Sequence, residues 1–135
     1  MTHLLDSNTC IHVMRPKGSA LVKFRYAAHP AGDVVLNTVV AGELFVGVER
    51  STNPPAERAR VDTLLAKHPV LVYDLPAAEA FGRIRAALAV AGTPIGPLDA
   101  QIAAIALVHG LTLVTHNTGE FSRVPGLRIE DWELP

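Results

Sequence analysis

Short strand signals alternate with longer helical signals along the whole sequence. The strand signals are rich in valine and leucine, and each is followed by a stretch with apolar residues at helical spacing. This alternation predicts a single α/β domain over residues 1–135 with a small, mainly parallel central sheet. The strands are expected at 3–5, 34–36, 70–73, 111–115 and 127–129, and the helices from about residue 8 and at 38–50, 55–67, 76–91 and 99–109.

The composition indicates a core of small aliphatic side chains. Hydrophobic residues make up 49% of the 135 residues and aromatic residues only 5%, which favours closely packed helices on the sheet. The longest strongly apolar stretch, 102–108, is far shorter than the roughly 20 residues that cross a membrane. No basic and then apolar leader begins the sequence, and Cys10 is the single cysteine. We therefore expect a cytoplasmic protein with no membrane contact.

Four acidic residues occupy related places in the predicted elements. Asp6 ends the first strand, and Glu43 lies one turn into helix 38–50, for which Thr38 is the expected cap. Asp99 opens the very apolar helix 99–109, and Glu120 follows the strand 111–115. Open α/β sheets bind ligands at the carboxyl ends of their strands. The pattern predicts one acidic pocket, which in proteins commonly holds a hard divalent cation.

Each of these acids also has an ordinary structural explanation. A glutamate such as Glu43 is a good helix former and is usually exposed. Asp99 could serve only as a helix cap, and 115–121 could be a simple Asn- and Gly-containing turn. It is the recurrence of acids at four comparable places that favours the pocket.

The charge balance permits a polyanionic substrate. The formal net charge is -1, but removing the four candidate acids from the thirteen leaves nine acids against twelve lysines and arginines. Four cations lie between residues 15 and 25, where they could contact nucleic acid or form a solvated helix face. The charges of helix 55–67 are expected mostly to face solvent: Glu57, Arg58, Arg60 and Asp62.

Several other chemistries find no support in the sequence. No two histidines have the i, i+4 spacing of a helical metal site, and Cys10 and His12 fall on different helix faces, so a zinc site is not expected. Neither the Gly-x-Ser-x-Gly motif of serine hydrolases nor the Gly-Lys-Ser/Thr of P-loop proteins occurs.

Taken in order, these segments resemble the PIN-domain ribonucleases, and most closely the VapC-type toxins of bacterial VapBC toxin-antitoxin pairs. The resemblance extends over nearly the whole chain. It rests on five blocks whose order and spacing match the family: 5–8, 42–44 with Gly47, 95–104, 113–121 and 126–132.

The resemblance implies a PIN-like three-layer α/β/α domain and endoribonuclease activity that depends on Mg²⁺ or Mn²⁺. It also implies a homodimer, inhibition by a VapB-type antitoxin, and larger toxin-antitoxin assemblies on DNA through that antitoxin. The family's acids correspond to Asp6, Glu43 and Asp99. Some members have an aspartate near Asn117, where this chain offers Glu120 as the fourth carboxylate.

The mechanism expected from these residues divides them into two groups. Asp6, Asp99 and Glu120 would hold one or two ions, and Glu43 would bind metal or orient the attacking water. The hydrogen-bonding side chains that would position water and phosphate are Ser7, Thr115 and Asn117. Such a mechanism predicts products with a 5′-phosphate.

Two other functions are possible in principle. Asp6 and Thr9 superficially match the Asp-x-Asp-x-Thr signature of aspartate-nucleophile phosphatases, but Asn8 replaces the second aspartate and no lysine follows Lys67. A non-catalytic binding module with the same fold is the other alternative, although such domains usually lose an acid. Among RNA substrates, tRNA is favoured over ribosomal or messenger RNA because the 115–121 segment is close to that of enterobacterial-type members.

Overall fold

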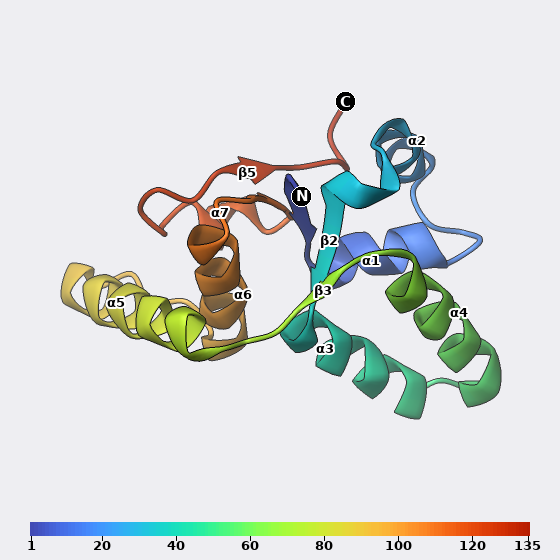
Figure 1. Ribbon diagram of the computed structural model, residues 1–135, viewed down its shortest axis with the longest axis horizontal. Helices are drawn as coiled ribbons and strands as arrows, with labels where there is room; N and C mark the ends of the chain where they lie inside the picture. The colour runs from blue at the N-terminus through green and yellow to red at the C-terminus, as the bar shows by residue number, and fades with distance from the viewer.

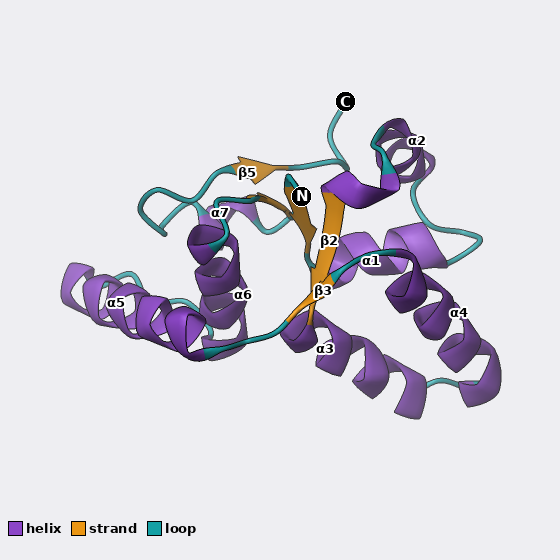
Figure 2. Ribbon diagram, in the orientation of Figure 1, coloured by secondary structure: helices purple, strands orange, loops and turns teal.

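In the computed structural model, which describes residues 1–135, a five-stranded sheet lies between two groups of helices (Figures 1 and 2). The strand order is β3-β2-β1-β4-β5, and every neighbouring pair is parallel. The predicted α/β/α architecture is therefore confirmed, with β1 at the centre. The strands are β1 His3–Leu5, β2 Val34–Asn37, β3 Val70–Leu71, β4 Thr112–Val114 and β5 Ile129–Glu130.

The helices flank this sheet on two sides. Figure 1 shows α5 and α6 on one side and α1, α2 and α4 on the other, while α3 contacts helices of both groups. No helix has both the length and the apolar character needed to cross a membrane. The helices are α1 Ser7–Met14, α2 Ala20–Ala28, α3 Thr38–Glu49, α4 Pro54–Lys67, α5 Leu75–Ala91, α6 Pro97–Val108 and α7 Thr118–Phe121, with a 3₁₀ turn at Ala31–Asp33.

The core is centred on the middle strands and on α6. Leu4 and Leu5 of β1 are fully buried, as is every residue of β2. Helix α6 is buried along most of its length, with four alanines among the covered residues, so it can pack closely against its neighbours. This central position explains why the predicted helix 99–109 is so apolar.

The starts of two helices differ from the prediction. Asn37, not Thr38, caps α3: its Oδ1 accepts a hydrogen bond from the Val40 N–H at 2.9 Å. Strand β2 continues one residue further than expected, and asparagine is the stronger cap. Helix α6 begins at Pro97 after Gly96, so Asp99 lies in its first turn and does not cap it. The capping explanation for Asp99 is therefore wrong.

One alternative explanation and one expectation also require correction. The segment after β4 contains the short helix α7 and is not a simple turn. Glu57 is buried, although it was expected to face solvent with its helix neighbours. Its carboxylate is paired with Arg15 from the end of α1 and with Arg60 of its own helix, at 3.6 and 3.2 Å.

Gly18 is required where the chain turns between α1 and α2. A Cβ atom added there would lie 1.9 Å from the carbonyl oxygen of His12, so backbone would have to move. We expect Gly18→Ala to lower the free energy of unfolding by roughly 1–3 kcal/mol in urea titrations. Gly82 in α5 has nothing within 4 Å of such an atom, and Gly82→Ala should instead raise it by roughly 0.5–1 kcal/mol. Equal effects of the two substitutions would contradict this account.

Candidate active site

The carboxyl ends of the parallel strands bring the candidate residues to one edge of the sheet. Asp6 directly follows β1 and Thr115 directly follows β4, its neighbour in the sheet. Helix α3, which carries Glu43, leaves from the end of β2 on the other side of β1. Three separate strand-to-helix connections therefore meet at this edge, where open α/β sheets bind ligands.

Asp6 is held firmly by backbone hydrogen bonds. Its side chain caps α1 by accepting from the Thr9 N–H at 2.9 Å, and its own N–H donates to the Val114 carbonyl at 3.1 Å. The residue is 7% exposed. The carboxylate thus has a fixed position beside β4, with one edge open toward solvent.

Ser7 connects helix α1 to helix α3. Its hydroxyl donates to Oε1 of Glu43 at 2.7 Å, and Glu43 is half-buried. The bond joins α1 to α3 and fixes one oxygen of Glu43. The alternative explanation, in which Glu43 is an ordinary exposed helix residue, does not fit this half-buried and hydrogen-bonded position.

Asp99 carries the clearest electrostatic signature of the site. Partial burial raises the pKa of Asp99 to about 6, helped by a hydrogen bond to Glu120 and by the charges of Glu120, Glu43 and Asp6. Below about pH 6, Asp99 is therefore mostly protonated in the metal-free site. Asp99 therefore lies within electrostatic reach of the other three predicted acids.

The β4–α7 connection fixes the position of Glu120. Thr115 is fully buried, and its hydroxyl accepts from the Asn117 N–H at 3.0 Å. The Asn117 side chain donates to Oε2 of Glu120 at 3.2 Å and is itself exposed. In this structure Thr115 therefore shapes the loop, whereas Asn117 and Ser7 lie at the accessible rim of the acidic group.

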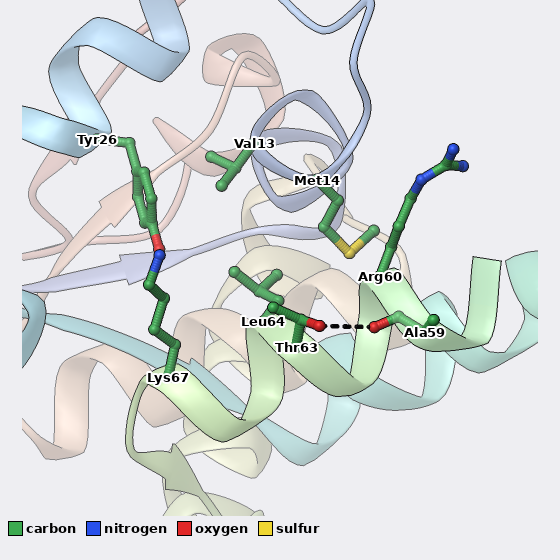
Figure 3. Close-up of a pocket in the computed structure, with 8 residues that line it drawn as sticks. All are labelled: Val13, Met14, Tyr26, Ala59, Arg60, Thr63, Leu64 and Lys67. Carbon is green, nitrogen blue, oxygen red and sulfur yellow. Dashed lines mark hydrogen bonds between the residues drawn. The ribbon is translucent and has the colours of Figure 1, made fainter. Parts of the chain in front are cut away.

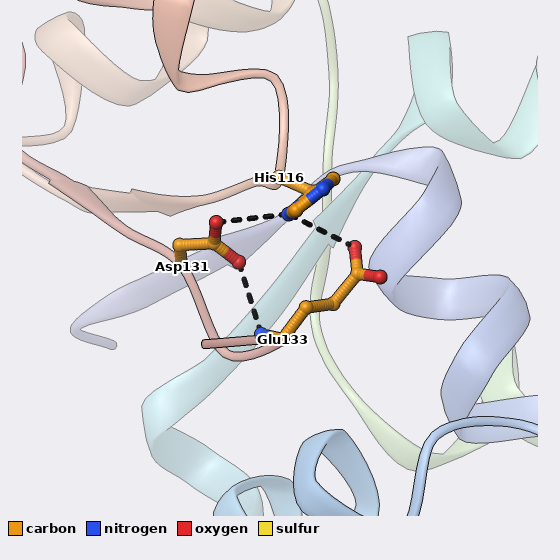
Figure 4. A group of neighbouring side chains, drawn as sticks. All are labelled: His116, Asp131 and Glu133. Atoms are coloured by element: carbon orange, nitrogen blue, oxygen red, sulfur yellow. Dashed lines mark hydrogen bonds and ion pairs between the residues drawn. The ribbon is translucent and has the colours of Figure 1, made fainter. Parts of the chain in front are cut away.

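A second cluster of possible metal ligands lies at the same edge (Figure 4). The ligand atoms of His116, Asp131 and Glu133 all lie within 4.8 Å of one another, a spacing that no three of the predicted acids reach. The hydrogen bond to Asp131 and the charges of Glu133 and Asp131 raise the pKa of His116. Asp131 directly follows β5, so the reasoning applied to the other strand ends could have found it in the sequence.

The hydrogen bonds of this cluster are satisfied internally. His116 Nδ1 donates to Asp131 at 2.9 Å, and the other oxygen of Asp131 accepts from the Glu133 N–H. His12 Nδ1 accepts from the Ser19 N–H, so its Nε2 carries the proton that binds Glu133 at 3.1 Å. The cluster fastens the C-terminal segment to α1 through the contact between His12 and Glu133.

A mainly apolar pocket lies away from the acids, between α1, α2 and α4 (Figure 3). It has a volume of about 340 Å³ and is bordered by Met14, Tyr26 and Leu64, with Lys67 beside the Tyr26 ring. None of the candidate site residues lines it. No carboxylate lines it, so it offers no acidic ligands for a divalent ion.

Comparison with known proteins identifies the family. The PIN domain model matches residues 3–127. The tRNA(fMet)-specific endonuclease VapC of Salmonella typhimurium is 40% identical over 129 residues, and that of Shigella flexneri is 42% identical over 129 residues. Each alignment covers 96% of this chain and 96% of the relative.

The solved structures agree with the sequence comparisons. The VapC-like chain in the crystal structure of DNA-bound VapBC from Salmonella typhimurium superimposes with a TM-score of 0.90 at 39% identity, covering 98% of both chains. The agreement extends over the complete sheet and its flanking helices. The chain therefore belongs to the PIN-domain family and, within it, to the VapC group.

Proposed function

We propose that this chain is a Mg²⁺- or Mn²⁺-dependent endoribonuclease that acts as the toxin of a toxin-antitoxin pair and inhibits translation by cutting RNA. The observation that carries the proposal is the raised pKa of Asp99 among three further carboxylates at the edge of the sheet. A carboxylate whose pKa is raised by burial and by neighbouring carboxylates is also stabilised by a divalent cation.

The donor atoms suit a hard divalent ion. The four acids offer only oxygen, the ligand type preferred by Mg²⁺ and Mn²⁺. Since no three of them converge within 4.8 Å, water or substrate phosphate would complete the coordination, as is usual for Mg²⁺. We assign Asp6, Asp99 and Glu120 as the residues that would hold the ion.

The remaining residues would orient the reactants. When bound, a divalent ion supplies charge neutralisation, a more acidic water and polarisation of the phosphodiester. Glu43, with one oxygen fixed by Ser7, has its second oxygen available to orient the attacking water. Asn117 keeps a second amide N–H that can donate to a phosphate oxygen, and the Ser7 oxygen can accept from a bound water while its hydrogen stays on Glu43. Thr115 maintains the loop that carries Asn117.

Metal affinity should depend on pH because proton and metal compete for Asp99. Below about pH 6 the protonated Asp99 binds Mn²⁺ weakly, and affinity should rise as the pH passes through that value. The raised pKa also affects the stability of the metal-free protein. Protonated Asp99 contributes stability at acid pH, and this contribution is lost as the pH rises from 3.8 to about 6. Thermal melts in EDTA and in Mn²⁺ at about pH 5 and about pH 7 measure both effects. An Mn²⁺-induced rise in melting temperature that is equal at the two pH values would contradict this assignment.

The proposed substrate and partners draw on the relatives. Two relatives at 40% and 42% identity are named tRNA(fMet)-specific endonucleases, which supports tRNA as the substrate. The DNA-bound VapBC complex supports a VapB-type antitoxin as the partner, with assembly on DNA through that antitoxin. A homodimer is part of the same proposal.

The test is cleavage of total RNA by the purified, antitoxin-free chain in Mg²⁺ or in EDTA. We expect discrete tRNA fragments that form only with metal and carry 5′-phosphate ends. Cutting of ribosomal or messenger RNA alone would retain the nuclease and reject the tRNA assignment, whereas cyclic-phosphate ends would reject the mechanism. Intact RNA under every metal condition would favour the non-catalytic binding module.

A further inference from the structure

A large polar pocket lies where α1, α3 and α4 come together. Its volume is about 500 Å³, greater than that of the apolar pocket in Figure 3, and only one of its nine lining residues is hydrophobic. Arg15, Arg50 and Arg60 border it, together with the hydroxyls of Ser51 and Thr52. None of these residues belongs to the acidic site or to the cluster in Figure 4.

The pocket carries more positive charge than its single carboxylate can neutralise. Glu57 is the only acid among the lining residues, and it pairs with Arg15 and Arg60. The Arg50 side chain makes no hydrogen bond or ion pair in the structure and is exposed. Three arginines against one carboxylate leave an excess of positive charge that faces solvent.

Glu57 holds the side chains of Arg15 and Arg60 in place and leaves some of their N–H donors available to a further ligand. Its carboxylate is 8% exposed, whereas Arg15 and Arg60 are 50% and 40% exposed. Each guanidinium has five N–H donors and uses one nitrogen in the contact with Glu57, so other donors remain available. A buried carboxylate thus holds two planar donors in place at the pocket wall, an arrangement suited to phosphate oxygens.

The pocket lies at a short and defined distance from the acidic site. Ser7 and Glu43 are hydrogen-bonded where α1 and α3 adjoin, and both helices lead from there to the pocket. Arg15 follows Ser7 by eight residues, about 12 Å along the helix axis, and Arg50 follows Glu43 by seven, about 10 Å. A few nucleotides of an extended single strand can bridge this separation.

We propose that this pocket is a second phosphate-binding subsite, which holds the RNA backbone a few nucleotides from the bond that is cut. The inference rests on the proposed ribonuclease function and adds how the substrate is held. Arg50 contacts the phosphate directly, and Arg15 and Arg60 complete the recognition with donors fixed by Glu57. Binding here is independent of base identity, since phosphate contacts position the strand without reading its sequence.

The experiment compares Arg50→Ala with the wild-type chain and with Arg85→Ala, which removes an exposed arginine from α5 outside the pocket. RNA affinity is measured by fluorescence anisotropy in EDTA over a series of salt concentrations. We expect Arg50→Ala to weaken binding roughly tenfold and to reduce the slope of log affinity against log salt by about one. Arg85→Ala should leave both unchanged.

Hydrolysis of bis(p-nitrophenyl) phosphate separates the subsite from the chemistry. This small diester reaches only the acidic site, so wild type and Arg50→Ala should hydrolyse it at the same rate while RNA cleavage falls in the variant. If wild type cleaves RNA but Arg50→Ala retains its affinity and salt slope, the subsite is rejected, and the charge would serve another partner such as an acidic protein segment. If wild type neither binds nor cleaves RNA, the proposed function itself fails.

Discussion

Replacing Asp99 with asparagine is expected to reduce RNA cleavage by a factor of roughly 10² to 10³. The substitution removes a carboxylate that would hold the metal, and the neutral amide still fits the first turn of α6. It also removes a negative charge that burial and the charges of Glu120, Glu43 and Asp6 disfavour at neutral pH. The metal-free chain should therefore become more stable, by roughly 1 kcal/mol after allowance for solvent screening.

These opposite effects distinguish a functional carboxylate from a structural one. Single-turnover cleavage in Mg²⁺ and urea unfolding in EDTA measure them on the same preparation. Asp62→Asn is the matched control, because Asp62 is an exposed carboxylate on α4 that pairs only with Arg58 at 2.9 Å. It should change neither quantity appreciably. Wild-type cleavage by the Asp99→Asn chain would remove Asp99 from the proposed machinery.

A site residue can be predicted from the sequence when its position follows from the residues around it in the chain. The acid at the end of β1 can be placed from the sequence because strand and helix signals meet there, and the same holds for Glu120 after β4. Their convergence depends on β1 and β4 being neighbours, a pairing that no local pattern encodes. The recurring strand-end pattern anticipates the pocket, but its geometry follows from the strand order.

Charged residues away from strand ends were harder to predict. Glu57 has the helical spacing of a solvent-facing residue, yet it is buried because Arg15 arrives from the end of α1. Likewise, His116 meets Glu133 only because β5 brings the C-terminal segment back beside β4. Both cases are long-range ion pairs, which local propensity does not report. The predicted cap of α3 was wrong by a single residue, since Asn37 caps the helix and not Thr38.

Asp6 offers the sharpest separation of structure from chemistry, since its carboxylate both caps α1 and faces the acidic site. Asparagine is an equally good cap, so Asp6→Asn should keep the bond from the Thr9 N–H and retain wild-type stability or slightly more. Cleavage should nevertheless fall by a factor of roughly 10² to 10³, because the charge is lost. Asp6→Ala should lose the cap as well and lower the free energy of unfolding by about 0.5–2 kcal/mol.

Ser19→Ala provides the converse control. Ser19 caps α2 by accepting from the Val22 N–H at 3.3 Å and takes no part in the acidic group. Its loss should cost stability comparable to the Asp6→Ala cap, about 0.5–2 kcal/mol, while RNA cleavage at a temperature well below unfolding stays at the wild-type rate. If Asp6→Asn cleaved RNA as fast as wild type, the Asp6 carboxylate would be only a helix cap. If instead Ser19→Ala lost cleavage as fully as Asp6→Asn, a weakened helix alone would account for the loss, and the chemical role of Asp6 would be without support.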